Sequence, residues 1–359
     1  MDERYVGLDD HMESCTFGVL GPSGKRLKSM VVETNGRALV DAVRSISGKI
    51  HLCMEEGARS AWIHELLRPH VAELIVTVPK ERKGQSKDDL RDAFARAEEI
   101  RIGAVETRVY KAPEYLAALQ SAARTYGIAV RDSVRVKNRL KAVFRSRGIR
   151  VDRGVYDPNS RGEWLKELPG AHRPLAEWMG EELDALQPLR EKAEAWLLKE
   201  AKTHPIIRKL DTAPGMGPIR AAQVVAIGAN PHRFRTKQQF WSYCGFGIVT
   251  HSSSDWTHDK HGRWVRAEVQ QTRGLTRKRQ PVLKAVFKGA ATTVITQLPR
   301  DPLHEAYRRM LESGIKPNLA KLTLARRIAA IVLAMWKHEE VYDPKLLKGV
   351  TDQASTVPK

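Results

Sequence analysis

Short apolar runs with polar neighbours set the pattern of the first part of the chain. Three of these runs, Tyr5 to Asp9, Thr16 to Leu20 and Met30 to Glu33, are separated by turn-prone residues, as between Gly21 and Gly24. Runs of this length, bounded by glycine, proline and serine, are typical of strands. The pattern therefore predicts three strands joined as an antiparallel meander.

Helical and strand patterns alternate after the meander. We expect helices near Leu39 to Ile46 and Ala61 to Leu67, strands over Ile50 to Glu55 and Leu74 to Val78, and a helix from Lys87 onward. The predicted order is βββαβαβα, which we interpret as an α/β domain with a ribonuclease-H-like mixed sheet over residues 1–111.

A long helical pattern follows the sheet domain. Between Pro113 and Arg147 there is no proline and one glycine, Gly127, and apolar residues recur near heptad spacing. A turn-rich stretch from Asp152 to Pro158 ends this pattern, and a second helical pattern returns after it. We predict an antiparallel, coiled-coil-like helical stalk over residues 112–204.

The later half of the first stalk helix is strongly basic. Its basic residues include Arg131, Arg135, Lys137, Arg139, Lys141 and Arg145. Such a run is either a solvated helix face or a surface that contacts phosphates, and the pattern alone does not choose between them.

The last part of the chain reads as mainly α. Helical patterns lie at Ile219 to Ile227, Pro281 to Ile295, Leu303 to Leu311 and Leu319 to Trp336. We therefore predict a helical C-terminal domain over residues 205–348 and a frayed tail over 349–359.

Charge narrows the choice of partner. The 359 residues include 61 Lys and Arg against 42 Asp and Glu, a net charge of +19. This excess favours a polyanion, with nucleic acid ahead of an acidic membrane surface. No apolar run approaches the roughly 20 residues that span a bilayer, and we see no signal peptide or lipidation signal. The three cysteines, Cys15, Cys53 and Cys244, are widely spaced, so we expect no disulfide framework and a cytoplasmic protein.

Acidic residues end two of the predicted strands. Because successive side chains of a strand face opposite ways, Asp9 faces away from the apolar set of Val6 and Leu8, whereas Asp10 follows that set. The same reasoning selects Glu55 over Glu56 at the end of the later strand.

A third group of acids begins the helix after the last strand of the sheet. Asp89 and Asp92 share a helical face, but so do Asp88 and Asp92, and spacing does not choose between the pairs. Each acid taken alone is an ordinary surface charge. Together, on this order of elements, they predict a cluster that binds Mg²⁺ or Mn²⁺ and supports phosphodiester chemistry.

A glycine-containing turn begins the C-terminal domain. The stretch from Thr212 to Ile219 resembles a helix-hairpin-helix element, in which backbone N–H groups approach a phosphate. A plain interhelical turn is the alternative. The candidate nucleic-acid contacts of this region are Gly215, Gly217, Arg220, Arg233 and Arg235.

A serine-rich loop follows an apolar and aromatic stretch. Ser252, Ser253 and Ser254 precede Asp255 and Trp256. A cluster of serines is most often only a loop, and a nucleophilic serine requires an activating neighbour.

Over almost its whole length the chain resembles the DEDD-type transposases of bacterial insertion-sequence family one-ten. The resemblance rests on Val6-Gly7-Leu8-Asp9, Met54-Glu55-Glu56-Gly57, Lys87-x-Asp89-x-x-Asp92-Ala93, Pro214-Gly215-Met216-Gly217, Gly245 through Ser253, and Ala325-Arg326-Arg327. Each motif is weak alone, but the order and spacing are specific.

The resemblance implies a RuvC-like metal domain whose tetrad is Asp9, Glu55, Asp89 and Asp92, and a C-terminal serine nucleophile at Ser253. The family has glycine after that serine, whereas this chain has Ser254, so Ser252 remains an alternative. It further implies a covalent phosphoserine link to DNA and a structured guide RNA. Because neither candidate site alone accounts for both domains, we expect a homo-oligomer, a dimer or tetramer, that works on DNA at the bacterial nucleoid.

Two rival functions remain at this point. The first is a resolvase-like, metal-dependent nuclease that uses water as its nucleophile. The second is a nucleic-acid-binding protein without catalytic activity, whose carboxylates are surface charges.

Overall fold

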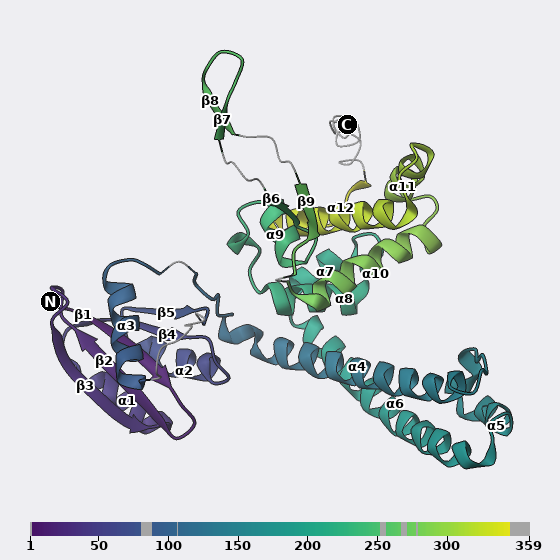
Figure 1. Ribbon diagram of the computed structural model, residues 1–359, viewed down its shortest axis with the longest axis horizontal. Helices are drawn as coiled ribbons and strands as arrows, with labels where there is room; N and C mark the ends of the chain where they lie inside the picture. The colour runs from purple at the N-terminus through teal and green to yellow at the C-terminus, as the bar shows by residue number, and fades with distance from the viewer. Residues whose placement is uncertain are drawn as a thin grey trace. The chain divides into compact units, whose positions relative to one another are not determined.

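The computed structural model describes residues 2–79, 88–105, 107–251, 256–266, 271–277 and 279–344. The chain divides into two compact units, Met1–Glu114 and Tyr115–Lys359 (Figure 1). Within the described residues, no helix has both the length and the apolar character needed to cross a membrane.

The first unit is an α/β domain built on a mixed five-stranded sheet. Its strand order is β3-β2-β1-β4-β5, with β1 antiparallel to β2 and parallel to β4. The strands are β1 (Glu3–Asp10), β2 (Ser14–Leu20), β3 (Arg26–Glu33), β4 (Lys49–Glu55) and β5 (Glu73–Thr77). The helices are α1 (Gly36–Arg44), α2 (Ser60–Leu67), the short η1 (Arg68–His70) and α3 (Asp89–Arg101). The predicted order βββαβαβα is confirmed.

Helices cover both faces of this sheet. Val6 and Leu8 of β1 share one core with residues of α1 and α2, including Leu39 and Ile63. On the other face Phe94 and Ala97 of α3 pack with Tyr5 and Leu20, and Ile100 packs with Cys53 and Ile75. The alternation of each strand thus decides which side chains meet α3.

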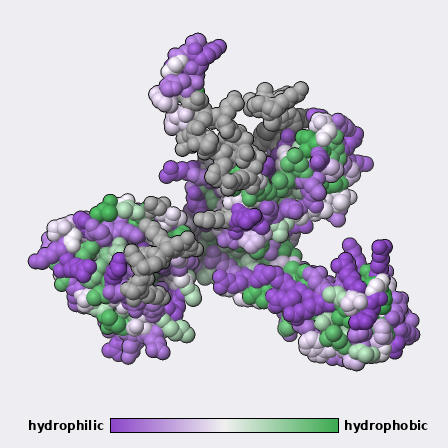
Figure 2. Space-filling model, viewed as in Figure 1, coloured by the Kyte–Doolittle hydropathy of each residue, from purple (hydrophilic) through white to green (hydrophobic). Residues whose placement is uncertain are grey.

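Two long helices begin the second unit. They are α4 (Ala117–Arg145) and α6 (Arg173–Lys202), which run antiparallel along each other and form a helical stalk (Figure 1). Short elements close the stalk tip: η3 (Arg153–Tyr156), α5 (Pro158–Lys166) and η4 (Gly170–His172). Leu140, Phe144, Val155 and Leu168 form a separate buried core there. Hydrophilic residues cover much of the stalk face that Figure 2 shows.

The rest of the second unit is mainly helical. Its elements are η2 (Glu114–Leu116), which joins the two units in sequence, α7 (Pro205–Asp211), α8 (Gly217–Gly228), η5 (Pro231–Arg233), α9 (Lys237–Tyr243), α10 (Pro281–Gln297), α11 (Pro302–Glu312) and α12 (Pro317–His338). Phe240 and Phe246 meet Phe287 edge-on in its core, with ring centroids 5.8 and 6.4 Å apart.

Four short strands interrupt the helices of this unit, and the sequence pattern did not predict them. They are β6 (Ile248–His251), β7 (Trp256–His258), β8 (Trp264–Arg266) and β9 (Gln271–Leu275). β6 pairs with β9, and β7 pairs with β8 as a hairpin inserted between them. They escaped prediction because strands this short offer too few positions for an apolar alternation to be visible.

Candidate functional site

The candidate metal centre lies where two parallel strands end side by side. The β1–β4 register runs to Leu8 opposite Met54, and Asp9 and Glu55 are the next residues on these strands. Two residues earlier, Gly7 lies directly against the backbone of α3, as the overlap of an added Cβ with Ala93 shows. Asp9 and Glu55 therefore point toward the α3 face of the sheet, as the alternation predicted.

His11 joins the first strand to the start of α3. Its Nε2 atom lies 3.0 Å from an Asp9 carboxylate oxygen and 3.0 Å from Asp89 Oδ1. Ligand atoms of Asp9, His11 and Asp89 all lie within 4.8 Å of one another, and the three residues are half-buried. Sequence reasoning did not select His11, although it lies two residues after Asp9, because the search was for carboxylates and only the fold brings this ring to Asp89.

The Asp88 and Asp89 carboxylates have different surroundings. Asp88 is the N-cap of α3, and its side chain accepts from the backbone N–H groups of Leu90 and Arg91 at 3.1 and 3.3 Å. Asp89 is the first residue of the helix and turns toward His11. An aspartate that immediately precedes a helix is a recognised cap, and this signal was available from the sequence. Asp92 follows Asp89 within the first turn of α3.

Glu55 is paired with a buried arginine. Arg96 of α3 contacts the Glu55 carboxylate and also donates to Glu99 at 3.3 Å. Arg96 is among the buried charged residues, so a compensating carboxylate is required there. The sequence signal for Arg96 is its place beside Ala93, Ala97 and Ile100 on the buried side of α3.

The carboxylates that alternation assigned to the opposite side make ion pairs. Arg59 lies 3.1 Å from Asp10, while Glu56 accepts from Ser60 Oγ at 2.9 Å and contacts Lys111. Burial raises the pKa of the Asp10 carboxyl, and the neighbouring Arg59 opposes that rise. These pairs hold the strand ends in place around Asp9 and Glu55.

The donor set suits a divalent cation. Asp9 and Asp89 offer carboxylate oxygens, which Mg²⁺ and Mn²⁺ prefer, and both side chains remain partly open to solvent. Among the described residues this group does not include Glu55, which is paired with Arg96, or Asp92, which lies on the first turn of α3. The two carboxylates therefore fit a divalent metal centre.

The basic face of the stalk helix is largely open. Arg131, Arg139 and Arg145 are exposed, and Arg135 makes an ion pair with Asp132 at 3.0 Å. Lys137 lies over the Tyr156 ring at 5.3 Å, and Lys141 is half-buried. Most of this positive charge is therefore available to a polyanion.

The glycine turn is packed against α10. Gly215 and Gly217 both have positive φ, 72° and 68°, and a Cβ on Gly215 would overlap the backbone of Ala290. The Arg220 guanidinium donates to the Gly215 carbonyl and, at 3.1 Å, to Thr293 Oγ1. Burial lowers the pKa of Arg220. Arg220 thus fastens the turn to α10 through its guanidinium.

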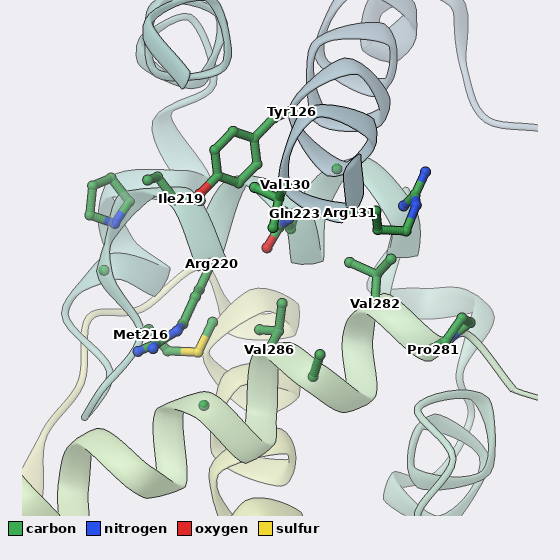
Figure 3. Close-up of a pocket in the computed structure, with 15 residues that line it drawn as sticks. Tyr126, Val130, Arg131, Met216, Ile219, Arg220, Gln223, Pro281, Val282 and Val286 are labelled. Atoms are coloured by element: carbon green, nitrogen blue, oxygen red, sulfur yellow. The ribbon is translucent and has the colours of Figure 1, made fainter. Parts of the chain in front are cut away.

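A cavity of about 650 Å³ lies between α4, α8 and α10, next to this turn. Figure 3 shows Tyr126 and Val130 of α4 facing Ile219 and Gln223 of α8, with Val286 of α10 below. Its walls are mainly apolar. Because apolar walls offer few hydrogen-bond donors to a phosphate, we do not assign phosphate binding to this cavity.

The two arginines after α8 differ in their surroundings. The Arg233 guanidinium lies over the Phe234 and Tyr243 rings, at 5.1 and 5.0 Å from their centroids. Arg235 is exposed. Of the two, Arg235 is the more accessible to a phosphate.

The serine loop begins from a firmly held turn. Ser252 and Ser253 lie outside the described residues, but the turn that leads to them is described. Gly245 has a φ of 79° and contacts Arg279, and Phe246 is fully buried. Arg326 donates to the Phe246 carbonyl at 3.0 and 2.7 Å.

Cations gather around this turn. Burial lowers the pKa of Lys284, and repulsion from Arg279, Lys288 and Arg326 lowers it further. Arg279 and Arg326 touch the Gly245–Phe246 turn itself. Such a group of like charges is suited to binding an anion such as a phosphate.

Comparison with known families gives two matches. A model described as Transposase matches residues 6–147, which include Asp9, Glu55, Asp89 and Asp92. A model described as Transposase IS116/IS110/IS902 family matches residues 207–307, which include the glycine turn and the serine loop. Curated proteins gave no match.

Proposed function

The chain belongs to the IS116/IS110/IS902 family of transposases, and on that premise we propose that it cuts and rejoins insertion-sequence DNA with a serine nucleophile and a divalent cation. The observation that carries the proposal is the meeting of Asp9 and Asp89 around His11. Carboxylates brought together from a strand end and a helix start are the ligands that such chemistry requires.

In the metal centre, Asp9 and Asp89 hold the cation, with Glu55 and Asp92 completing the proposed tetrad. A bound Mg²⁺ or Mn²⁺ supplies charge stabilisation to phosphate oxygens. His11 orients both aspartates through its Nε2 contacts, and Arg96 orients Glu55.

In the second unit, the Ser253 hydroxyl attacks a DNA phosphorus, with Ser252 as the alternative nucleophile. The new Oγ–P bond replaces the bond from phosphorus to one strand, whose oxygen leaves with a proton. Attack by a hydroxyl of another strand reverses the step and joins the strands. Arg279, Lys284 and Arg326 provide the positive charge that holds the phosphate near the loop.

We assign the exposed arginines of α4 to the backbone of a guide RNA, and we expect a homo-oligomer in which domains of different subunits combine. The support for the RNA is the open positive charge of Arg131, Arg139 and Arg145. The support for the oligomer is that the metal centre and the serine loop belong to different units of the chain.

Strand exchange tests the proposal. Element-end DNA, target DNA and the element's RNA are incubated with protein and Mg²⁺, and covalent adducts are read on a denaturing gel. We expect Ser253→Ala to reduce adduct and product by at least ~10³-fold, as loss of a nucleophile does. Ser254→Ala is the matched control and should retain activity.

The same gel separates the rivals. Loss of adduct in Ser252→Ala alone would move the nucleophile to Ser252. Cleavage that persists without adduct in both variants indicates water as the nucleophile. Unchanged strand exchange in Asp9→Asn would remove the metal centre from the reaction.

A further inference from the structure

The β7–β8 hairpin is a self-contained element with no role in the chemistry described above. Its tip is closed by Asp259, whose carboxylate accepts from the N–H groups of His261 and Arg263 at 2.8 and 2.9 Å. The Arg263 side chain donates to the same carboxylate at 3.0 Å, and Gly262 takes a φ of 74°. These hydrogen bonds lower the pKa of Asp259 and fix the turn. The hairpin therefore presents its side chains in a defined geometry.

Two tryptophans stand exposed on this hairpin. Trp256 is 60% exposed and Trp264 is 65% exposed. Trp256 pairs with Arg266 across the strands and His258 pairs with Trp264, so both indoles share one face with His258. The His258 ring lies 3.9 Å from the Trp264 ring, centroid to centroid. The face is an aromatic platform open to solvent.

The charge around the platform identifies its class of partner. The segment from Trp256 to Arg266 carries Lys260, Arg263 and Arg266 against Asp259 alone, and Figure 2 colours most of its described tip as hydrophilic. Protein interfaces of comparable aromatic content are depleted of charge at their centre. Exposed aromatic rings among cations are the combination that binds unpaired bases, because rings stack on bases while cations contact the backbone.

The position of the hairpin along the chain identifies which nucleic acid. Trp256 follows Ser253 by three residues, a length of chain that spans at most about 11 Å. A base held on Trp256 therefore belongs to the DNA next to the serine that attacks it. This step rests on the proposed function of Ser252 or Ser253.

We propose that the β7–β8 hairpin stacks Trp256 and Trp264 on unpaired DNA bases beside the phosphate that is cut. Stacking there would hold the strand open and keep the scissile phosphate near the loop. Stacking of a base on an aromatic side chain contributes about 1–3 kcal/mol per base, so each indole accounts for a roughly 5- to 150-fold change in affinity.

The test is a binding assay on the full chain without divalent cation, so that no strand is cut. Three fluorescent probes are compared: an element-end duplex with a three-nucleotide single-stranded gap, the same duplex fully paired, and single-stranded RNA of the same sequence. The double variant Trp256→Ala/Trp264→Ala should bind the gapped DNA at least tenfold more weakly. Its affinity for the paired duplex and its dependence on salt should not change, because stacking displaces few counterions.

Matched controls isolate the hairpin. Trp178→Ala/Trp196→Ala removes two indoles of α6 that are 57% and 38% exposed, and it should leave both affinities unchanged. Trp256→Phe/Trp264→Phe keeps the stacking faces and should retain most of the binding to gapped DNA. Circular dichroism of each variant checks its fold.

Three results would overturn the proposal: equal affinity of the alanine variant and the unmodified protein for gapped DNA, an equal loss on paired and gapped DNA, or a loss confined to single-stranded RNA of the same sequence. A changed oligomeric state of the alanine variant, with DNA affinity retained, would mark the platform as a protein interface instead. Because the assay needs no cutting, it stays distinct from the adduct gel. If the unmodified protein forms the adduct but the alanine variant binds gapped DNA as tightly as it does, only the role of the hairpin is rejected. If no adduct forms but the alanine variant loses binding to gapped DNA, only the role of the serine is rejected.

Discussion

At the scale of single residues, His11 is the contact on which the geometry of the metal centre depends. Its Nε2 atom touches Asp9 and Asp89 at the same distance, 3.0 Å. Because groups that orient metal ligands contribute about 10- to 100-fold in metal affinity, we expect His11→Ala to weaken Mn²⁺ binding about tenfold. Isothermal titration calorimetry measures this, with His51→Ala in β4 as the control. Tighter binding in His11→Ala would show that His11 competes with the cation instead.

The close contact between β1 and α3 explains why the motif has glycine at position 7. A Cβ at this position would overlap backbone atoms of Ala93 and Ala97 in α3, the helix that carries Asp89. We expect Gly7→Ala to destabilise the first unit by about 1–3 kcal/mol and to weaken metal binding, because α3 must shift away from β1. Urea unfolding followed by circular dichroism measures the loss. Gly162→Ala, where an added Cβ meets no atom within 4 Å, should lose no stability.

At this scale the sequence predicted which way side chains point along a strand better than it predicted side-chain contacts between elements. Alternation placed Asp9 and Glu55 on the correct side of the sheet because it follows from backbone geometry. His11 and Arg96 were not predicted, because the contacts of His11 with Asp89 and of Arg96 with Glu55 join different elements, and only tertiary structure brings these pairs together.

At the scale of elements, an ion pair with one covered partner joins the short helix of the stalk tip to α6. Arg161 donates to both Asp184 carboxylate oxygens at 2.7 Å, and the two residues join α5 to α6. The Arg161 side chain is nearly covered, whereas Asp184 is 38% exposed. The hydrogen bonds from Arg161 lower the pKa of Asp184 below its usual 3.8.

This pair gives the stalk a pH dependence. A carboxylate whose folded pKa is depressed stabilises the fold above its unfolded pKa, and that stability is lost as pH falls through the folded pKa. We expect Asp184→Asn to cost about 1 kcal/mol at pH 7, after allowing for solvent screening. The difference from the unmodified protein should shrink below about pH 4. A constant difference from pH 7 to pH 3, measured by urea unfolding, would exclude this role for Asp184.

The role of the basic face of α4 can be tested by how the affinity for nucleic acid depends on salt concentration. If Arg139 and Arg145 contact phosphates, Arg139→Gln/Arg145→Gln should lower the slope of log affinity against log salt by about 1 per contact. The control Arg308→Gln/Arg309→Gln removes two exposed arginines of α11 that make ion pairs with Glu305. Fluorescence anisotropy with the element's RNA gives both slopes. Equal slopes for the two variants would identify the α4 face as merely solvated.

Elements differed in how far the sequence predicted them. The helices α4, α10 and α12 were predicted from the sequence because apolar residues recur on the same face over many helical turns. The β7–β8 hairpin was missed because its apolar side chains, Trp256, Trp264 and Val265, are exposed among polar ones and form no buried face, and its turn is closed by Asp259.

At the scale of the whole molecule, two sites with different chemistry lie in separate compact units. The carboxylates belong to Met1–Glu114, and the cations around the Gly245–Phe246 turn belong to Tyr115–Lys359. Family membership, the mixed sheet and the helical second part followed from the sequence, since they depend on motifs and periodicity. How the units combine on DNA depends on partners, which no single-chain pattern encodes.

The most direct measurement is Mn²⁺ binding to the full chain by calorimetry, in the unmodified protein and in Asp9→Asn, Asp89→Asn and the double variant. If the two carboxylates share one cation, each single variant should lose at least tenfold in affinity, and the double variant should lose little more than the weaker-binding single one. Circular dichroism checks that each variant is folded. Single variants that bind Mn²⁺ as the unmodified protein does, or losses that add fully in the double variant, would contradict a shared metal centre.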